Sequence, residues 1–166
     1  MTKEALLAQA AVITAALRDL DATEPAAAEQ ALRGFRVSAF EAALREAHAE
    51  GWATPKEAGG IRFGRVTRAD PALSGFSLDV VEMSGAAPGA HTHPRGEFDL
   101  SFVLDGQPRF DGRPPGWVVY PPGSRHVPTV TGGRMLIAYF LPAGEIVFDG
   151  QRDEQKKPGD VQTAKG

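Results

Sequence analysis

Three of the four histidines in this chain lie between residues 85 and 130, with an acidic residue close behind two of them. His91 and His93 are two residues apart, Glu97 follows, and His126 comes later. Residues two apart on a strand point to the same face, so His91 and His93 can offer two imidazoles to one ion. Imidazole and carboxylate ligands together suit divalent transition metals such as Fe, Mn, Zn or Ni. The spacing predicts a metal site with ligands His91, His93, Glu97 and His126, and it leaves the identity of the metal open.

Two further elements must bring these side chains together. Glu97 needs a turn to come back beside the histidines, and residues 94–96 (Pro-Arg-Gly) are of the types that make turns. His126 must arrive from a separate strand, because a site on one hairpin alone would be open and weakly held. After residue 55 the chain is rich in Gly and Pro, and β-type segments occur at 61–66, 76–83, 98–104, 117–120, 134–141 and 146–148. Short strands with Gly/Pro turns predict an antiparallel sandwich or barrel.

The first 54 residues are instead rich in alanine and other helix formers. A first amphipathic helix is predicted from apolar residues on one face: Leu6, Ala10, Ile13, Leu17 and Leu20. A second would start near Thr23 with Pro25 in its first turn. A third would start with a capping box of Ser38 and Glu41 and bury Phe40, Leu44 and Ala47. We therefore expect a helical segment (1–54) that packs on the barrel or on a dimer mate, a β-barrel (55–149) and a flexible polar tail (150–166).

Strand alternation adds catalytic candidates to the ligands. If Glu97 points into the barrel, Asp99 shares its face, while the opposite apolar face must be covered by the helices or by a second subunit, which suits a homodimer. A buried Asp99 near a metal is a candidate acid or base. The alternative is a hydrogen bond from a turn amide, Arg109 or Arg125. Tyr120 is a further catalytic candidate; both it and Tyr139 could line the pocket or only fill it. His48, on the third predicted helix, is expected to be solvated.

Composition limits the classes of function. The 166 residues suit one domain with a real core, the net charge of −3 and scattered basic residues argue against a nucleic-acid partner, and no cysteine is present. No apolar run is long enough to span a bilayer, and the start has no signal-peptide pattern. The chain also lacks a glycine-rich dinucleotide loop, so neither a nucleotide nor a flavin cofactor is expected. A cytoplasmic protein without membrane contact is the default expectation.

The histidine-rich region resembles the two motifs of the cupin superfamily. The residues that match the first motif are Gly85, His91, His93, Glu97 and Gly106, and those that match the second are Gly116, Pro121, Gly123 and His126. Gly106 comes two residues later than usual, and Val130 stands where cupins often have Asn. All four ligand types are nevertheless present. The resemblance implies a mainly β fold with N-terminal helices, namely a cupin-type antiparallel β-barrel (double-stranded β-helix or jelly roll) with a metal held by these four residues.

A narrower resemblance extends over about residues 60–150. The tracts Gly96-Glu-Phe-Asp-Leu100, Pro108-Arg-Phe-Asp-Gly112 and Gly116-Trp-Val-Val-Tyr-Pro-Pro-Gly-Ser124 are similar to those of the bacterial 4-hydroxylaminobenzoate lyases of nitroaromatic degradation. This resemblance implies a small aromatic carboxylate as substrate and its conversion, with water, to 3,4-dihydroxybenzoate and ammonia. Glu97 or Asp99 would then move protons. An arginine would hold the carboxylate, and Arg62, Arg65 and Arg134 are the candidates on strands.

Three alternatives stay open at this stage. Without a metal, Glu97 becomes the leading acid or base and the histidines its partners. A cupin dioxygenase would use the same four ligands for Fe(II) and O2 on a small aromatic substrate, and it would consume oxygen. A non-catalytic ligand-sensing cupin would need an output module, and the helices show no basic recognition face.

Overall fold

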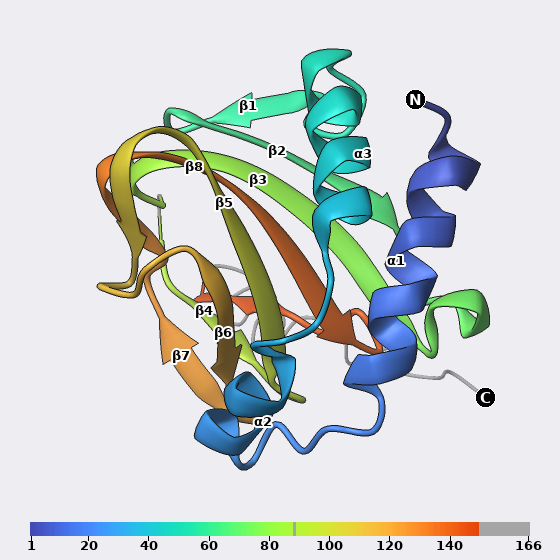
Figure 1. Ribbon diagram of the computed structural model, residues 1–166. Helices are drawn as coiled ribbons and strands as arrows, with labels where there is room; N and C mark the ends of the chain where they lie inside the picture. The colour runs from blue at the N-terminus through green and yellow to red at the C-terminus, as the bar shows by residue number, and fades with distance from the viewer. Residues whose placement is uncertain (88, 150–166) are drawn as a thin grey trace, which may run out of the picture.

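Antiparallel strands dominate the chain after residue 55 (Figure 1). The computed structural model describes residues 1–87 and 89–149. The helices are α1 (Lys3–Leu17), α2 (Pro25–Leu32) and α3 (Ser38–Ala49), with a short 3-10 helix η1 (Pro71–Leu73). The strands are β1 (Lys56–Ala58), β2 (Ile61–Thr67), β3 (Phe76–Ala86), β4 (His91–His93), β5 (Glu97–Phe110), β6 (Gly116–Tyr120), β7 (Ser124–His126), β8 (Thr129–Pro142) and β9 (Val147–Phe148). Each predicted strand overlaps an observed one.

The strands pair into two antiparallel sheets. The large sheet has the order β1-β2-β3-β8-β5-β6, and the small sheet has the order β7-β4-β9. This confirms the prediction of a mainly β, cupin-type jelly roll preceded by helices. Within the described residues, the hydrogen-bonded strands form these two sheets and do not close into one ring. An apolar cluster that includes Met83, Phe110, Ile137 and Tyr139 lies on the inner face of the large sheet.

The helices cover the outer face of the large sheet. Figure 1 shows α1 and α3 side by side on this face, while α2 packs near β6. Apolar residues of all three helices share one core with Phe98, Leu100 and Phe102 of β5. The predicted cover of this face is therefore supplied by the chain's own helices. The sequence favoured a dimer because this apolar face needed a cover. Since the helices cover it, that reason for a dimer no longer holds, and the homodimer stays a prediction.

Phe40 joins helix α3 to the two longest strands of the large sheet. Its ring centroid lies 6.5 Å from that of Phe102 and 5.7 Å from that of Phe140, and Phe40 is only 2% exposed. Replacing it with Ala leaves a cavity, and we expect Phe40→Ala to lower the free energy of unfolding by about 3–5 kcal/mol. Chemical denaturation measures this difference. Val12→Ala on α1, at a side chain that is 60% exposed, is the control and should change stability by less than about 0.5 kcal/mol.

The second and third helices start where the sequence predicted, with Pro25 in the first turn of α2 and Ser38 at the start of α3, but their caps differ. Helix α2 begins at Pro25 with Glu24 at its N-cap, whereas Thr23 hydrogen-bonds to Asp21 in the preceding turn. The predicted capping box of α3 is wrong, because Ser38 is already the first helical residue. The side chain of Glu41 instead accepts hydrogen bonds of 2.9 and 2.7 Å from Arg45, four residues later. The predicted buried face of Phe40, Leu44 and Ala47 is confirmed.

Strands β5 and β8 extend well beyond their predicted ends. Irregular register between Gly106 and Arg109 lets the pairing of β5 with β8 continue past Gly106. Gly106 has φ +70°, and a Cβ there would lie 2.6 Å from the carbonyl oxygen of Gly132. Glycine at this position of the first motif is therefore required by the close approach of the two strands.

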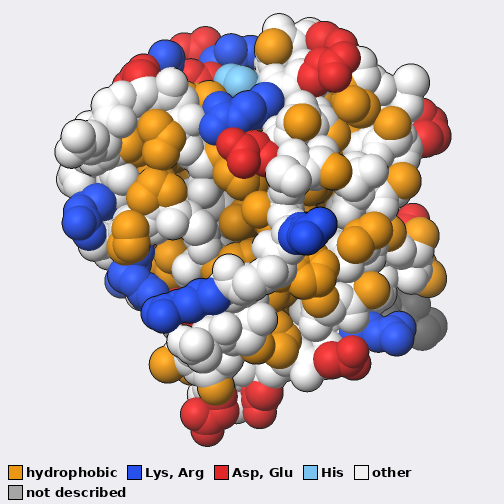
Figure 2. Space-filling view, in the orientation of Figure 1, with side chains coloured by type: hydrophobic (Ala, Val, Ile, Leu, Met, Phe, Trp, Pro, Cys, Tyr) orange, Lys and Arg blue, Asp and Glu red, His pale blue; other side chains and the backbone are white. Residues whose placement is uncertain are grey.

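The surface gives no sign of a basic stripe on the face shown in Figure 2. Lys and Arg side chains there occur in several places, interrupted by acidic, apolar and uncharged groups. Among the described residues, no helix has the length and apolar character needed to cross a membrane. The predicted tail (150–166) lies outside the described residues, and the boundaries at 54 and 149 stay predictions.

Candidate metal centre

The four predicted ligands come from three strands in two sheets. His91 and His93 lie on β4, and His91 is directly opposite His126 of β7. The predicted turn at residues 94–96 carries the chain from the small sheet to Glu97, the first residue of β5. Gly96 has φ +85° in this turn, and a Cβ there would lie 2.8 Å from the carbonyl oxygen of Tyr120. Turn and strand pairing together bring the four side chains to one point between the sheets.

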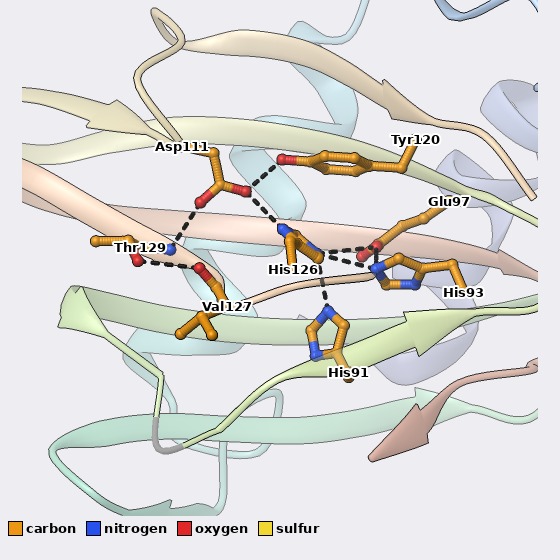
Figure 3. Close-up of polar contacts among 8 residues, drawn as sticks. All are labelled: His91, His93, Glu97, Asp111, Tyr120, His126, Val127 and Thr129. Atoms are coloured by element: carbon orange, nitrogen blue, oxygen red, sulfur yellow. Dashed lines mark hydrogen bonds and ion pairs between the residues drawn. The ribbon is translucent and has the colours of Figure 1, made fainter. Parts of the chain in front are cut away.

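The side chains of His91, His93, Glu97 and His126 converge, as Figure 3 shows. The Nε2 atom of His126 lies 2.9 Å from Nε2 of His91 and 2.9 Å from Nε2 of His93. The Oε2 atom of Glu97 contacts Nε2 of His93 and lies 3.8 Å from Nε2 of His126. One ligand atom from each of the four residues falls within 4.8 Å of the others.

This donor set fits a divalent transition metal. His93 and Glu97 are fully buried, and neither oxygen of Glu97 has a hydrogen bond of regular geometry with any described residue. Three imidazole nitrogens and a carboxylate that face one another in a largely buried site need a proton or a cation between them. A nitrogen-rich set with one carboxylate suits Fe, Mn, Ni or Zn. The cluster can hold a metal, and its geometry does not choose among these ions.

Two histidines of the cluster have pKa values shifted in opposite directions. Burial lowers the pKa of His91 to about 4, so its imidazole is neutral near pH 7. Burial also opposes charge on His126, but Asp111 and Glu97 outweigh it and raise the pKa of His126 to about 9. Burial alone would raise the pKa of Glu97, whereas the imidazoles of His126 and His93 lower it to about 2. The site therefore holds a carboxylate that is already ionised for binding a cation.

Asp111, which was not among the predicted site residues, contacts the Nδ1 side of the His126 imidazole. Its Oδ2 atom lies 2.6 Å from Nδ1 of His126, its Oδ1 atom accepts a 2.9 Å hydrogen bond from the backbone N–H of Thr129, and the Tyr120 hydroxyl donates to it. A carboxylate on Nδ1 fixes the imidazole so that Nε2 faces the cluster (Figure 3). The only signal in the sequence was the Asp111-Gly112 pair, which indicates a turn. The carboxylate's partner is set by the fold.

We expect Asp111→Asn to weaken metal binding while the fold persists. The variant keeps the shape of the side chain but loses the charge that orients His126, and such changes lower metal affinity by about 10- to 100-fold. A competition titration against a chromophoric chelator measures the affinity. Asp105→Asn is the matched control, since Asp105 lies on β5, shortly before Asp111, but pairs with Arg134 at the surface. Equal affinity of the two variants would contradict the positioning role.

The two other predicted catalytic residues lie beside the cluster. The ring of Tyr120 stacks on His93 with centroids 5.9 Å apart, and its hydroxyl points to Asp111. Asp99 is fully buried on the same face as Glu97, and burial, together with the charge of Glu97, raises the pKa of Asp99 well above its ordinary value. The alternative pairing of Asp99 with an arginine is wrong, because Arg109 donates to the Gly112 carbonyl and Arg125 pairs with Asp149.

A cavity of about 950 Å³ opens beside the cluster, between the two sheets. Its walls are largely apolar and include Phe63, Val81, Met83, Tyr139, Leu141 and Phe148. His91 is the one member of the cluster that lines it. This size and apolar lining are typical of small-molecule sites. A second cavity, of about 390 Å³, lies on the helix-covered side of the large sheet and contains none of the four cluster residues.

The fourth histidine does not match its prediction. We expected His48 to be solvated, but its side chain is only 13% exposed. Its Nδ1 atom lies 2.8 Å from the Thr54 hydroxyl and its Nε2 atom 3.0 Å from Glu82. Burial lowers the pKa of His48, partly opposed by the charge of Glu82. His48 thus links α3 to β3 and contacts none of the four cluster residues.

A known protein family matches the part of the chain that contains this site. The family described as 4-hydroxylaminobenzoate lyase (PnbB) matches residues 27–148, which include most of helix α2, all of helix α3, all the described strands and the four clustered residues. The chain belongs to this family. The 4-hydroxylaminobenzoate lyase family is therefore the correct interpretation of the tracts singled out in the sequence, and the chain is a member with a cupin-type fold.

Individual relatives support the same assignment. A 4-hydroxylaminobenzoate lyase from Nocardioides sp. (strain LMS-CY) is 34% identical over 109 residues, which cover 60% of this chain and 64% of that protein. The chain thus matches just under two thirds of that relative's length. A 4-hydroxylaminobenzoate lyase from Pseudomonas putida is 30% identical over 120 residues, covering 62% of this chain and 68% of that protein.

Solved structures are similar to part of the chain at low sequence identity. An oxalate oxidase in complex with the substrate analogue glycolate is 17% identical, with 57% of each chain covered and a TM-score of 0.40. An RmlC-like cupin protein from Ralstonia eutropha JMP134 is 14% identical, with 55% of this chain and 60% of that chain covered and a TM-score of 0.39.

Proposed function

We propose that this protein converts 4-hydroxylaminobenzoate and water into 3,4-dihydroxybenzoate and ammonia. One observation carries the proposal. In a chain of the 4-hydroxylaminobenzoate lyase family, His91 of the four-residue cluster lines an apolar cavity. The cavity walls suit an aromatic ring. The cluster is where the polar, reacting end of the substrate would lie.

The reaction balances without an external oxidant. One substrate molecule and one water give one 3,4-dihydroxybenzoate and one ammonia, because the N–O bond of the substrate supplies the oxidising equivalent. In the proposed sequence the N–OH oxygen is protonated and leaves as water, and a second water adds at the neighbouring ring carbon. The resulting imine is then hydrolysed, which releases ammonia. No nicotinamide or flavin is needed for any of these steps.

The chain's own residues would bind, orient and move protons. His91, His93, Glu97 and His126 would hold a divalent metal, which when bound supplies Lewis acidity toward the departing oxygen or toward the attacking water. The apolar walls, with Tyr139 among them, would orient the ring and exclude bulk water. Asp111 would keep His126 in its binding orientation, with the Tyr120 hydroxyl holding Asp111 in turn.

Proton transfer is assigned to the carboxyls of β5. Glu97 is the only carboxyl of the cluster, and Asp99 lies two residues further on the same inward face of the strand. Neither Asp99 oxygen has a hydrogen bond of regular geometry with a described residue, so its carboxyl is free to exchange a proton with Glu97. Neither Asp99 nor Glu97 lines the larger cavity, so Asp99 would pass its proton to Glu97, and the proton would reach the substrate at the His91 edge of the cluster.

Anaerobic turnover tests the proposed reaction. Purified protein is incubated with 4-hydroxylaminobenzoate without oxygen, and ammonia and 3,4-dihydroxybenzoate are quantified over time. The proposal expects the two products in a 1:1 ratio at a rate that oxygen does not change. Product formation only in the presence of oxygen, with oxygen consumed, would overturn it in favour of a dioxygenase, for which the same four ligands are suited.

A further inference from the structure

The geometry points to Arg65 on β2 as the residue that binds the carboxylate of an aromatic substrate. This inference rests on the proposed function. It adds which residue of the cavity binds the negatively charged carboxylate of the substrate. Arg62, Arg65 and Arg134 were the candidates on strands, and of these Arg65 lines the cavity of about 950 Å³. Arg62 and Arg134 both pair with Glu82, next to His48 of α3, on the helix-covered side of the sheet.

Strand register places Arg65 across the inner face from the cluster. Arg65 pairs with Asp79, Asp79 with Tyr139, and Tyr139 with Asp99, so the four residues form one row over β2, β3, β8 and β5. Neighbouring strands are about 4.8 Å apart, which puts Arg65 roughly 10 Å from Tyr139 and roughly 14 Å from Asp99. The carboxylate and the hydroxylamino group of a para-substituted benzoate lie at opposite ends of the ring. His91 of the small sheet and Arg65 of the large sheet both line the cavity, so one substrate molecule could meet the cluster with its hydroxylamino group and Arg65 with its carboxylate.

The guanidinium of Arg65 is fixed but still has donors to offer. Its Nε atom donates to Asp79 Oδ1 at 2.7 Å, and Nη2 donates to Asp79 Oδ2 at 2.9 Å and to the Gly144 carbonyl at 3.2 Å. A guanidinium has five N–H groups, so both protons on Nη1 remain, and no described residue accepts them. Asp79 therefore holds the fork in place, and the Nη1 edge is left for a ligand carboxylate.

Two other cations line the same cavity and are less suited to this role. Arg125 already forms an ion pair with Asp149, and its side chain is 57% exposed. Lys56 lies on the edge strand β1 and is exposed. Arg65 is the more enclosed, with 38% of its side chain exposed. Because Asp79 neutralises part of its charge, the expected gain in affinity is one charge-assisted hydrogen bond and not a full buried ion pair.

Equilibrium binding tests this assignment without turnover. The ligands are 4-aminobenzoate, which has no N–O bond to break, and its neutral isostere 4-aminobenzamide, titrated by calorimetry into metal-loaded protein. Wild type should prefer the carboxylate. Arg65→Gln should weaken 4-aminobenzoate by about 10- to 100-fold and leave 4-aminobenzamide within about twofold. Arg62→Gln, on the same strand but facing the helices, is the matched control and should bind both ligands as wild type does.

Each other outcome has a definite meaning. Unchanged 4-aminobenzoate affinity in Arg65→Gln would overturn the assignment, as would a selective loss in Lys56→Gln or Arg125→Gln instead. If Arg65→Gln fails to fold because Asp79 loses its partner, Arg65→Lys carries the test, since it keeps the charge but loses the fork and should still weaken 4-aminobenzoate. No preference for the carboxylate in wild type would overturn the proposed substrate class itself, together with this subsite.

Discussion

Glu97→Gln should release the bound metal and lower kcat for 4-hydroxylaminobenzoate by about 100- to 10,000-fold. Glu97 is fully buried and provides the only carboxylate of the four-residue cluster. Glutamine keeps the volume of the side chain but removes its negative charge, which both a divalent cation and proton transfer require. Metal content per chain and kcat, measured on the same preparation, check the two parts of this expectation.

The control for Glu97→Gln is the same substitution at an exposed site. Glu57 lies on β1, where every residue is exposed, and Glu57→Gln should keep full metal content and activity. Circular dichroism and thermal melting of both variants show whether the fold is retained. Normal turnover by a folded Glu97→Gln protein would exclude Glu97 both as a required ligand and as the acid or base.

Asp99→Asn should keep the metal and lose about 100-fold in kcat. Asparagine has nearly the same shape and leaves the four ligands untouched, but it cannot give up or accept the carboxyl proton. Asp99 is fully buried, and its inward position next to Glu97 suits a proton relay to that carboxylate. Steady-state kinetics together with metal analysis separate this variant from Glu97→Gln, which should lose both metal and turnover.

Ser101→Ala provides the comparison for Asp99→Asn. Ser101 is buried on the same face of β5, two residues further on, and its hydroxyl binds the backbone of Gly116. We expect this variant to stay within about threefold of wild type, because a lost neutral hydrogen bond contributes little compared with a lost proton carrier. If Asp99→Asn is as active as Ser101→Ala, the relay through Asp99 is refuted and Glu97 acts alone.

The inward and outward faces of β5 were predictable because polar and apolar residues alternate along the strand. Glu97, Asp99 and Ser101 point inward, and Phe98, Leu100 and Phe102 point toward the helices, as the sequence indicated. Strand ends were less predictable, since Gly106 looks like the end of a strand but in fact allows close contact with Gly132. The capping box of α3 was mispredicted because Glu41 has a competing partner in Arg45, and such side-chain choices depend on tertiary context.

The grouping of the four candidate ligands was predictable from the sequence, whereas the contact of Asp111 with His126 was not. Spacing alone brought out His91, His93, Glu97 and His126, because two residues on one strand face and a turn constrain where the side chains can go. Asp111 follows a long strand and reaches His126 only through the pairing of strands distant in sequence. The sequence also could not choose among the arginines, since which face of β2 is inward depends on how the helices pack.

Metal removal and reconstitution under anaerobic conditions show whether turnover depends on a metal ion at the four-residue cluster. Protein stripped with a chelator is assayed with 4-hydroxylaminobenzoate, and one equivalent each of Fe(II), Mn(II), Ni(II) or Zn(II) is then added back to separate samples. We expect no product from stripped protein, and recovery of 3,4-dihydroxybenzoate and ammonia in equal amounts when one metal ion per chain is bound. Full turnover by protein that contains no metal would show that the cluster acts without a metal.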